Sequence, residues 1–197
     1  MTQAPIDYFK LLLLLIGFPV GRSVQILAER FLLEPYPRKA WGSWLLIGWA
    51  IALLIAVIQF ALGTVVHSDR LGTSFPRLGI PTILYSLILL TLVNKMFPKP
   101  PPGDLEPAFL LTQFRQHYRY AYTCALGLAV IPFIIAPWAF GDQLISVPQI
   151  SRIVMMICFT VGFFVSPTHL AVHKVIWLIA FPFIMAIFVL YLNYGSG

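Results

Sequence analysis

The sequence predicts an all-α, polytopic membrane protein, a bundle of about five transmembrane helices preceded by amphipathic, interfacial amino-terminal helices. Of its 197 residues, 59% are hydrophobic and only 10% are charged, and the mean hydropathy is +0.87. These values lie far outside the range of soluble domains. No polar stretch is long enough for a soluble catalytic module. We therefore expect an amino-terminal interfacial segment, 1–43, and one membrane domain, 44–197.

Five apolar runs provide the expected transmembrane helices, because each approaches or reaches the length needed to cross a hydrocarbon layer of about 30 Å. They are residues 44–66, 78–97, 118–140, 149–166 and 167–194. The central run, 118–140, has Arg115 and Arg119 with three tyrosines at its start and Trp138 near its end. Basic and aromatic residues at the two ends are typical of a helix that meets both membrane surfaces.

Small residues recur at intervals of four in three of these runs. They are Ala121, Ala125 and Ala129 in the central run, Ala52 and Ala56 in the first, and Cys158, Gly162 and Ser166 in the fourth. Such stripes let helix backbones approach closely. We expect them to pack against helices of a protein partner or of a homo-oligomer, or against helices of the same chain.

The amino-terminal segment contains an apolar run from Leu11 to Phe18 that resembles the core of a signal peptide. No small-x-small cleavage site follows it, and about a dozen apolar residues are too few to span the membrane. Pro19 and Gly21 interrupt the run, and an amphipathic pattern follows. We therefore expect a pair of helices that lie on the cytoplasmic surface.

The distribution of positive charge predicts the orientation, because short cytoplasmic loops are enriched in Lys and Arg. With the amino terminus inside, nine basic residues face the cytoplasm and Arg70, Arg77 and Arg152 face outside. The nine are Arg22, Arg30, Arg38, Lys39, Lys95, Lys99, Arg115, Arg119 and Lys174. The carboxyl terminus is then outside. This scatter, without a basic stripe, also argues against nucleic acid as the partner that the formal charge of +6 would suggest.

Three histidines are the candidates for a metal or haem site. His169 and His173 share one helical face, and His117 precedes the central span on the same side. Imidazoles at one membrane level can ligate zinc or haem iron. However, no Glu accompanies the pair as in zinc proteases, and histidines near helix ends commonly lie among headgroups. We therefore expect no metal and no cofactor.

Charged and proline residues bear on transport. Apart from Arg152, the spans carry essentially no charge, which disfavours a channel or pump, although hydroxyl or backbone groups can also line a pore. Pro132, Pro137 and Pro182 are either hinges or kinks whose freed carbonyl oxygens find local partners. No catalytic motif is present, so we expect no enzyme. Four cytoplasmic residues either hold anionic lipid headgroups or only set the topology: Lys95, Lys99, Arg115 and Arg119.

The stretches FPVGRSVQILAERFLLEPYPRKAW and YRYAYTCALGLAVIPF, the second following a Gly-containing connector, resemble parts of bacterial Yip1-domain proteins. The resemblance implies five spans with a cytoplasmic amino terminus in the bacterial inner membrane, and a non-enzymatic role. Eukaryotic members act in vesicle traffic and bind small GTPases. This chain lacks their long polar amino-terminal region, so the resemblance does not extend to a GTPase partner.

Three hypotheses for function follow. The first is a non-catalytic membrane protein that organises lipids or protein partners, a Yip1-like role in membrane organisation or trafficking. The second is a small transporter or channel with a path near the proline-bearing spans. The third is a haem- or metal-binding redox subunit that uses His117, His169 and His173.

Overall fold

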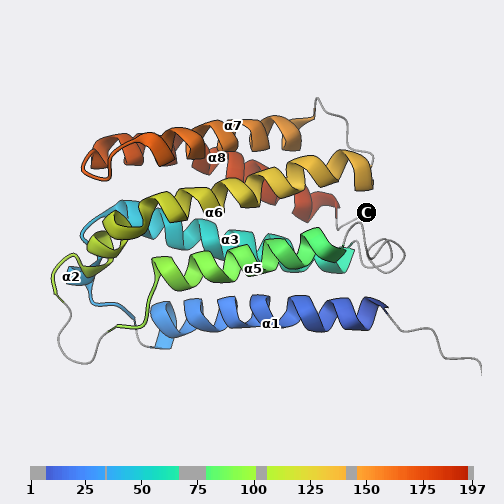
Figure 1. The fold of residues 1–197 in the computed structure, drawn as a ribbon, viewed down its shortest axis with the longest axis horizontal. Coiled ribbons are helices and arrows are strands. Elements are labelled where there is room, and N and C mark those ends of the chain that lie inside the picture. The colour runs from blue at the N-terminus through green and yellow to red at the C-terminus, as the bar shows by residue number, and fades with distance from the viewer. Residues whose placement is uncertain (1–7, 34, 67–78, 101–105, 141–145, 195–197) are drawn as a thin grey trace, which may run out of the picture.

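The computed structural model describes residues 8–33, 35–66, 79–100, 106–140 and 146–194, and all regular structure in these ranges is helical. The elements are α1 (Tyr8–Ala28), η1 (Glu29–Leu33), α2 (Arg38–Trp41), α3 (Trp44–Val66), α5 (Ile80–Met96), α6 (Phe109–Phe140), α7 (Val147–Phe164) and α8 (Leu170–Tyr194). The long helices lie side by side along one direction, with α7 and α8 at one edge and α1 at the other (Figure 1). The all-α prediction is confirmed. The expected positions of Arg70, Arg77 and both chain ends fall outside the described residues.

Within the described ranges, three helices have the length and apolar composition needed to cross a membrane. They cover Phe109–Ile135, Val147–Phe164 and Leu170–Leu190, and two shorter apolar helices, Trp44–Phe60 and Ile80–Met96, lie in the same bundle. The prediction of a membrane helical bundle is therefore confirmed in its coarse form. Each of the five expected runs overlaps a helix, and all but the first differ from it in their bounds. The crossing of the bilayer by α3 and α5 stays a prediction.

The central helix α6 is longer than the sequence suggests. The expected central run begins at residue 118, whereas α6 is one helix of 32 residues that begins at Phe109. Leu110 and Phe114 are buried, and the backbone N–H of Ala108 donates to the carbonyl oxygen of Lys39 at 2.7 Å. The start of α6 is thus packed against the segment around α2, which keeps the helix continuous.

The amino-terminal segment also differs from the expectation. The predicted break at Pro19 and Gly21 is wrong, because α1 runs through both residues and continues into the π-helix η1. A proline inside a helix removes one backbone hydrogen bond and costs about 3 kcal/mol, which packing can offset. α1 packs along α5 and also contacts α3. Ile16 of α1 is buried against Phe60, Ile83 and Ile135 of three other helices.

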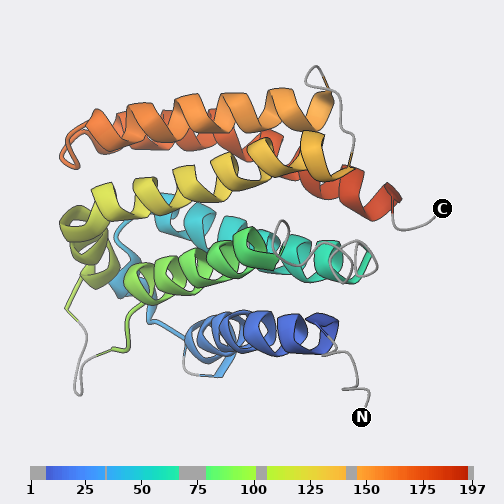
Figure 2. The ribbon, with the colours of Figure 1, turned by 45° about the vertical axis from the view of Figure 1, so that its right-hand side comes forward.

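The two ends of α1 lie at opposite ends of the bundle. Its Tyr8 end lies at the end of the bundle where α8 finishes, and its other end lies near α2 (Figures 1 and 2). α1 therefore follows the length of α5, whereas the sequence suggests a pair of helices lying across the end of the bundle.

An aromatic cluster joins the segment after α1 to the end of α5. Phe31 contacts Trp41 and Phe97, with ring centroids 5.5 and 5.1 Å apart. The Tyr36 hydroxyl donates a hydrogen bond to the carbonyl oxygen of Pro98. Burial raises the pKa of the Tyr36 phenol, outweighing the smaller opposite effect of Arg30, so the hydroxyl stays protonated as this bond requires. The cluster fixes α2 beside the end of α5.

The core lies where α3, α6, α7 and α8 meet, and large aromatic side chains fill it. The Trp49 ring contacts those of Tyr122, Phe159 and Trp177, with centroids 5.6, 6.5 and 4.6 Å apart. The stripe of Ala121, Ala125 and Ala129 is buried. Close packing on this stripe therefore takes place within the chain.

Candidate functional site

His173 lies in a buried polar cluster at the end of the bundle nearest α2. Its Nδ1 is 3.0 Å from the Tyr122 hydroxyl of α6, and its Nε2 is 3.1 Å from the carbonyl oxygen of Ser166, before α8. A carbonyl oxygen only accepts hydrogen bonds, so Nε2 carries a proton. In the neutral form of the ring, Nδ1 then accepts a hydrogen bond from the Tyr122 hydroxyl, so both ring nitrogens have partners within the chain.

The ring of Tyr122 is held from both sides. It stacks on His173 with the ring centroids 5.5 Å apart and an interplanar angle of 22°. On α7, a Cβ added at Gly162 would lie only 2.3 Å from a Tyr122 ring carbon. The small-residue stripe that the sequence shows in the fourth run therefore accommodates this ring at Gly162. The cluster fixes the positions of α6, α7 and α8 relative to one another.

The other two candidate ligands lie in different surroundings. His117 is half-buried on α6, and His169 is exposed just before α8. In the described part of the chain, no three His, Cys, Asp or Glu side chains are grouped closely enough to hold a metal ion. The His173 ring instead bridges the Tyr122 hydroxyl and the carbonyl oxygen of Ser166.

A second buried polar cluster lies toward the opposite end of the bundle, near the start of α7. Arg152 is buried and donates through an Nη to Gln149 Oε1 at 3.0 Å. The Gln149 amide donates to the carbonyl oxygen of Phe133 at 3.3 Å. Phe133 is four residues before Pro137, whose missing N–H leaves this carbonyl without its helical donor. The interpretation that a proline-freed carbonyl finds a local partner holds here, through a glutamine from the next helix.

The four candidate headgroup ligands are all exposed, Lys95 and Lys99 at the end of α5 and Arg115 and Arg119 near the start of α6. Of these four, Arg119 is positioned by neighbouring side chains. Arg119 Nε donates to the Tyr118 hydroxyl at 3.0 Å, and its guanidinium carbon lies 5.8 Å from the Phe163 ring centroid. This holds the Arg119 charge against α7 at the end of the bundle.

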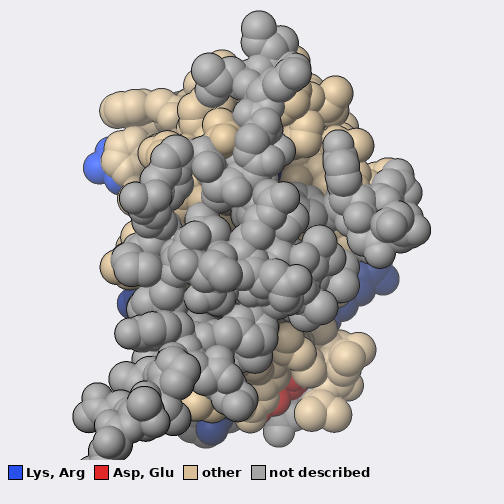
Figure 3. All heavy atoms as spheres, turned by 90° about the vertical axis from the view of Figure 1, so that its right-hand side faces the viewer, with Lys and Arg blue, Asp and Glu red and all other residues tan. Residues whose placement is uncertain are grey.

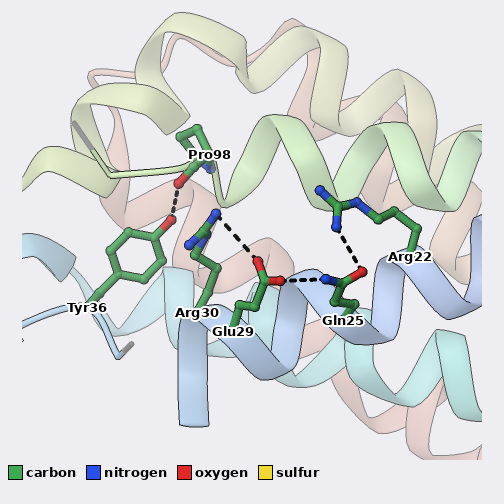
Figure 4. A network of polar contacts seen from close by, with 6 residues as sticks. All are labelled: Arg22, Gln25, Glu29, Arg30, Tyr36 and Pro98. Carbon is green, nitrogen blue, oxygen red and sulfur yellow. Dashed lines mark hydrogen bonds and ion pairs between the residues drawn. The ribbon is translucent and has the colours of Figure 1, made fainter. Parts of the chain in front are cut away.

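On α1 and the following η1, a row of polar side chains ends near Tyr36 (Figure 4). Arg22 donates to Gln25 at 2.8 Å, and Gln25 donates to Glu29 at 2.7 Å. Glu29 lies 3.9 Å from the guanidinium of Arg30. The row compensates the charges on α1 locally, which lowers the cost of placing them beside an apolar bundle.

The sequence analysis did not single out the elbow between α2 and α3 as a site. An open groove of about 530 Å³ lies there, lined by Tyr36, Arg38, Lys39, Trp41, Gly42, Ser43, Trp44 and Ile47. Lys174 of α8 places its Nζ 5.7 Å from the Trp44 ring centroid. The signal in the sequence is the pair Arg38 and Lys39 beside Trp41 and Trp44, residue types that are typical of a membrane surface.

Comparisons with protein-family models, with curated proteins and with solved structures find no match. The resemblance to Yip1-domain proteins therefore stays a prediction.

Proposed function

We propose that this chain is a non-catalytic, multi-spanning membrane protein that organises lipids or partner proteins at the cytoplasmic face. The observation that carries the proposal is the separation of exposed side chains along the bundle. Large apolar side chains are exposed along the flanks of the helices, including Ile51, Ile157 and Leu178. Apolar flanks of this kind suit contact with acyl chains.

Basic side chains gather at the end of the bundle that contains α2. They come from α2, the end of α5, the start of α6 and the start of α8, and those with exposed side chains are Arg38, Lys39, Lys95, Lys99, Arg115 and Arg119. Figure 3 looks onto the other end, where most of the described atoms in view are neither basic nor acidic. Positive residues favour the cytoplasmic surface and attract anionic headgroups. This supports a cytoplasmic location for the α2 end.

The proposed topology has α3, α5, α6, α7 and α8 crossing the bilayer, with the carboxyl terminus outside. The position of α1 beside α5 favours a crossing by α1 as well, so the amino terminus would also be outside. This departs from the cytoplasmic amino terminus that the sequence suggests. The reason is that α1 is one helix along the bundle and not a pair across its end.

Cysteine labelling tests this topology. With Cys124 and Cys158 replaced by Ala, single cysteines at Gln3 and Ser196 should both react with a membrane-impermeant maleimide added from outside intact cells or spheroplasts. A cysteine at Lys99 should react only after permeabilisation. Labelling of Gln3→Cys only after permeabilisation would show that α1 does not cross, and the same result for Ser196→Cys would overturn the orientation.

Extraction in a mild detergent tests the proposed function. The purified protein should retain anionic lipid, a partner protein or a second copy, measured by lipid analysis and native mass spectrometry. Flux of ions or small solutes across the membrane of proteoliposomes, absent from empty vesicles, would favour the transporter hypothesis instead. A stoichiometric haem spectrum or bound metal would favour the redox hypothesis. A monomer without lipid or protein partners would contradict the proposal.

A further inference from the structure

We infer that the groove at the elbow between α2 and α3 is a binding site for one anionic phospholipid, with the phosphate between Arg38 and Lys174 and an acyl chain along α3. This inference rests on the proposed membrane function and names the lipid class and the residues for it. It concerns a different set of residues from the exposed lysines and arginines on α5 and α6.

The charge of the groove favours an anion. Arg38 is exposed at the groove, and Lys174 stands over the ring of Trp44, which lines it. Among the described residues that line the groove, none is Asp or Glu. An arginine provides a planar fork of donors that matches phosphate oxygens, and a lysine adds a compact charge. Two tryptophans beside these cations are typical of a headgroup level in a membrane.

The groove is preorganised because its elbow is fixed from behind. Gly42 has a positive φ of 64°, and a Cβ added there would lie 2.6 Å from Cβ of Ala108. The hydrogen bond from Ala108 N–H to Lys39 C=O holds the same turn against α6. A rigid site loses less conformational freedom when it binds.

An apolar path leads from the groove along α3. Ile47 lines the groove, and Ile51, Leu54 and Ile58 continue the same helical face, each 39–46% exposed. Eleven residues separate the first of these positions from the last, which is about 16 Å at 1.5 Å per residue. One leaflet of the hydrocarbon layer is about 15 Å thick. The path therefore matches a phospholipid acyl chain, whereas a free phosphate or a soluble anion would leave it uncovered.

Quenching of tryptophan fluorescence by brominated lipids tests the site. The full-length protein is reconstituted in phosphatidylcholine vesicles with a minor fraction of brominated phosphatidylglycerol, or of brominated phosphatidylcholine as reference. Wild type should show stronger quenching by the brominated anionic lipid than by the reference. In Arg38→Gln/Lys174→Gln, the apparent affinity for the anionic lipid should fall on the order of tenfold, because each basic residue near the surface adds to the attraction.

The matched control removes two positive charges elsewhere, in Lys10→Gln/Arg22→Gln on α1. It should keep the wild-type preference, and thermal unfolding should show that both double variants are folded. An unchanged preference in Arg38→Gln/Lys174→Gln, or an equal fall in the control, would overturn the site while leaving the proposed function standing. Equal quenching of wild type by both brominated lipids would overturn the site, and it would also contradict the part of the proposed function that concerns lipids.

Discussion

Replacement of Gly162 by Ala is expected to lower the stability of the folded protein by about 1–3 kcal/mol, the usual cost of overpacking a filled core. The added Cβ would lie 2.3–2.8 Å from three carbons of the Tyr122 ring. The ring cannot move away easily, because its hydroxyl is bonded to His173 and its faces are packed. The midpoint of thermal unfolding in detergent, followed by circular dichroism, measures the loss.

Gly48→Ala is the matched control for this substitution. Gly48 lies inside α3, and a Cβ there would be 4.0 Å from the Trp177 ring, an ordinary contact. This variant should be as stable as wild type or slightly more so, because Ala favours the helix. A second variant, Gly162→Ala/Tyr122→Leu, should show a smaller effect of the alanine than the single substitution does. Equal stability of Gly162→Ala and wild type would contradict the close packing of α6 on α7.

The fold was predictable as far as apolar length and small-residue spacing determine it. The stripe of Ala121, Ala125 and Ala129 predicts close helix packing, and these residues are buried. The spacing could not show that Gly162 receives the ring of Tyr122, since this contact depends on how α6 and α7 are rotated against each other. Rotation depends on side chains from several helices at once, and no single run of sequence contains them.

The error at α1 has a local cause. Pro19 and Gly21 are helix breakers by propensity, and the interpretation of the segment rested on them. Propensity is a weak guide when tertiary packing is available. Ile16 and Ile26 are buried, and Ser23 Oγ donates to the carbonyl oxygen of Pro19 at 2.8 Å. The contacts of α1 with α5 outweigh the one backbone bond that the proline removes.

The candidate residues show the same limit. The predicted topology places His117, His169 and His173 at the same membrane level. Of the three, only His173 is buried in the structure, and its ring lies between the Tyr122 hydroxyl and the carbonyl oxygen of Ser166. The position of Lys174 beside the elbow groove could not be derived, because Lys174 reaches Trp44 only through the packing of α8 on α3. A site assembled from helix ends that are far apart in the chain leaves only scattered basic and aromatic residues as its signal in the sequence.

Replacement of Trp49 by Ala is expected to destabilise the protein by about 3–5 kcal/mol, more than the replacement of Gly162 by Ala should. Trp49 is buried and contacts rings from α6, α7 and α8, so its removal leaves a cavity where four helices meet. Inside a bilayer, lost packing contacts carry more of this cost than transfer from water does. Thermal unfolding in detergent should therefore show a large fall in midpoint.

One further variant separates the contribution of the ring from that of the indole N–H, and another serves as a control on the exposed flank of α3. Within the described part of the chain, the buried Trp49 Nε1 atom has no hydrogen-bond partner, so its removal should break no hydrogen bond. Trp49→Phe keeps a ring in the core and should lose much less stability than Trp49→Ala. Ile51→Ala on the exposed flank of the same helix should have little effect. If Trp49→Phe were as damaging as Trp49→Ala, the indole N–H would have a partner in the folded protein, and ring packing would not be the main source of stability at this crossing.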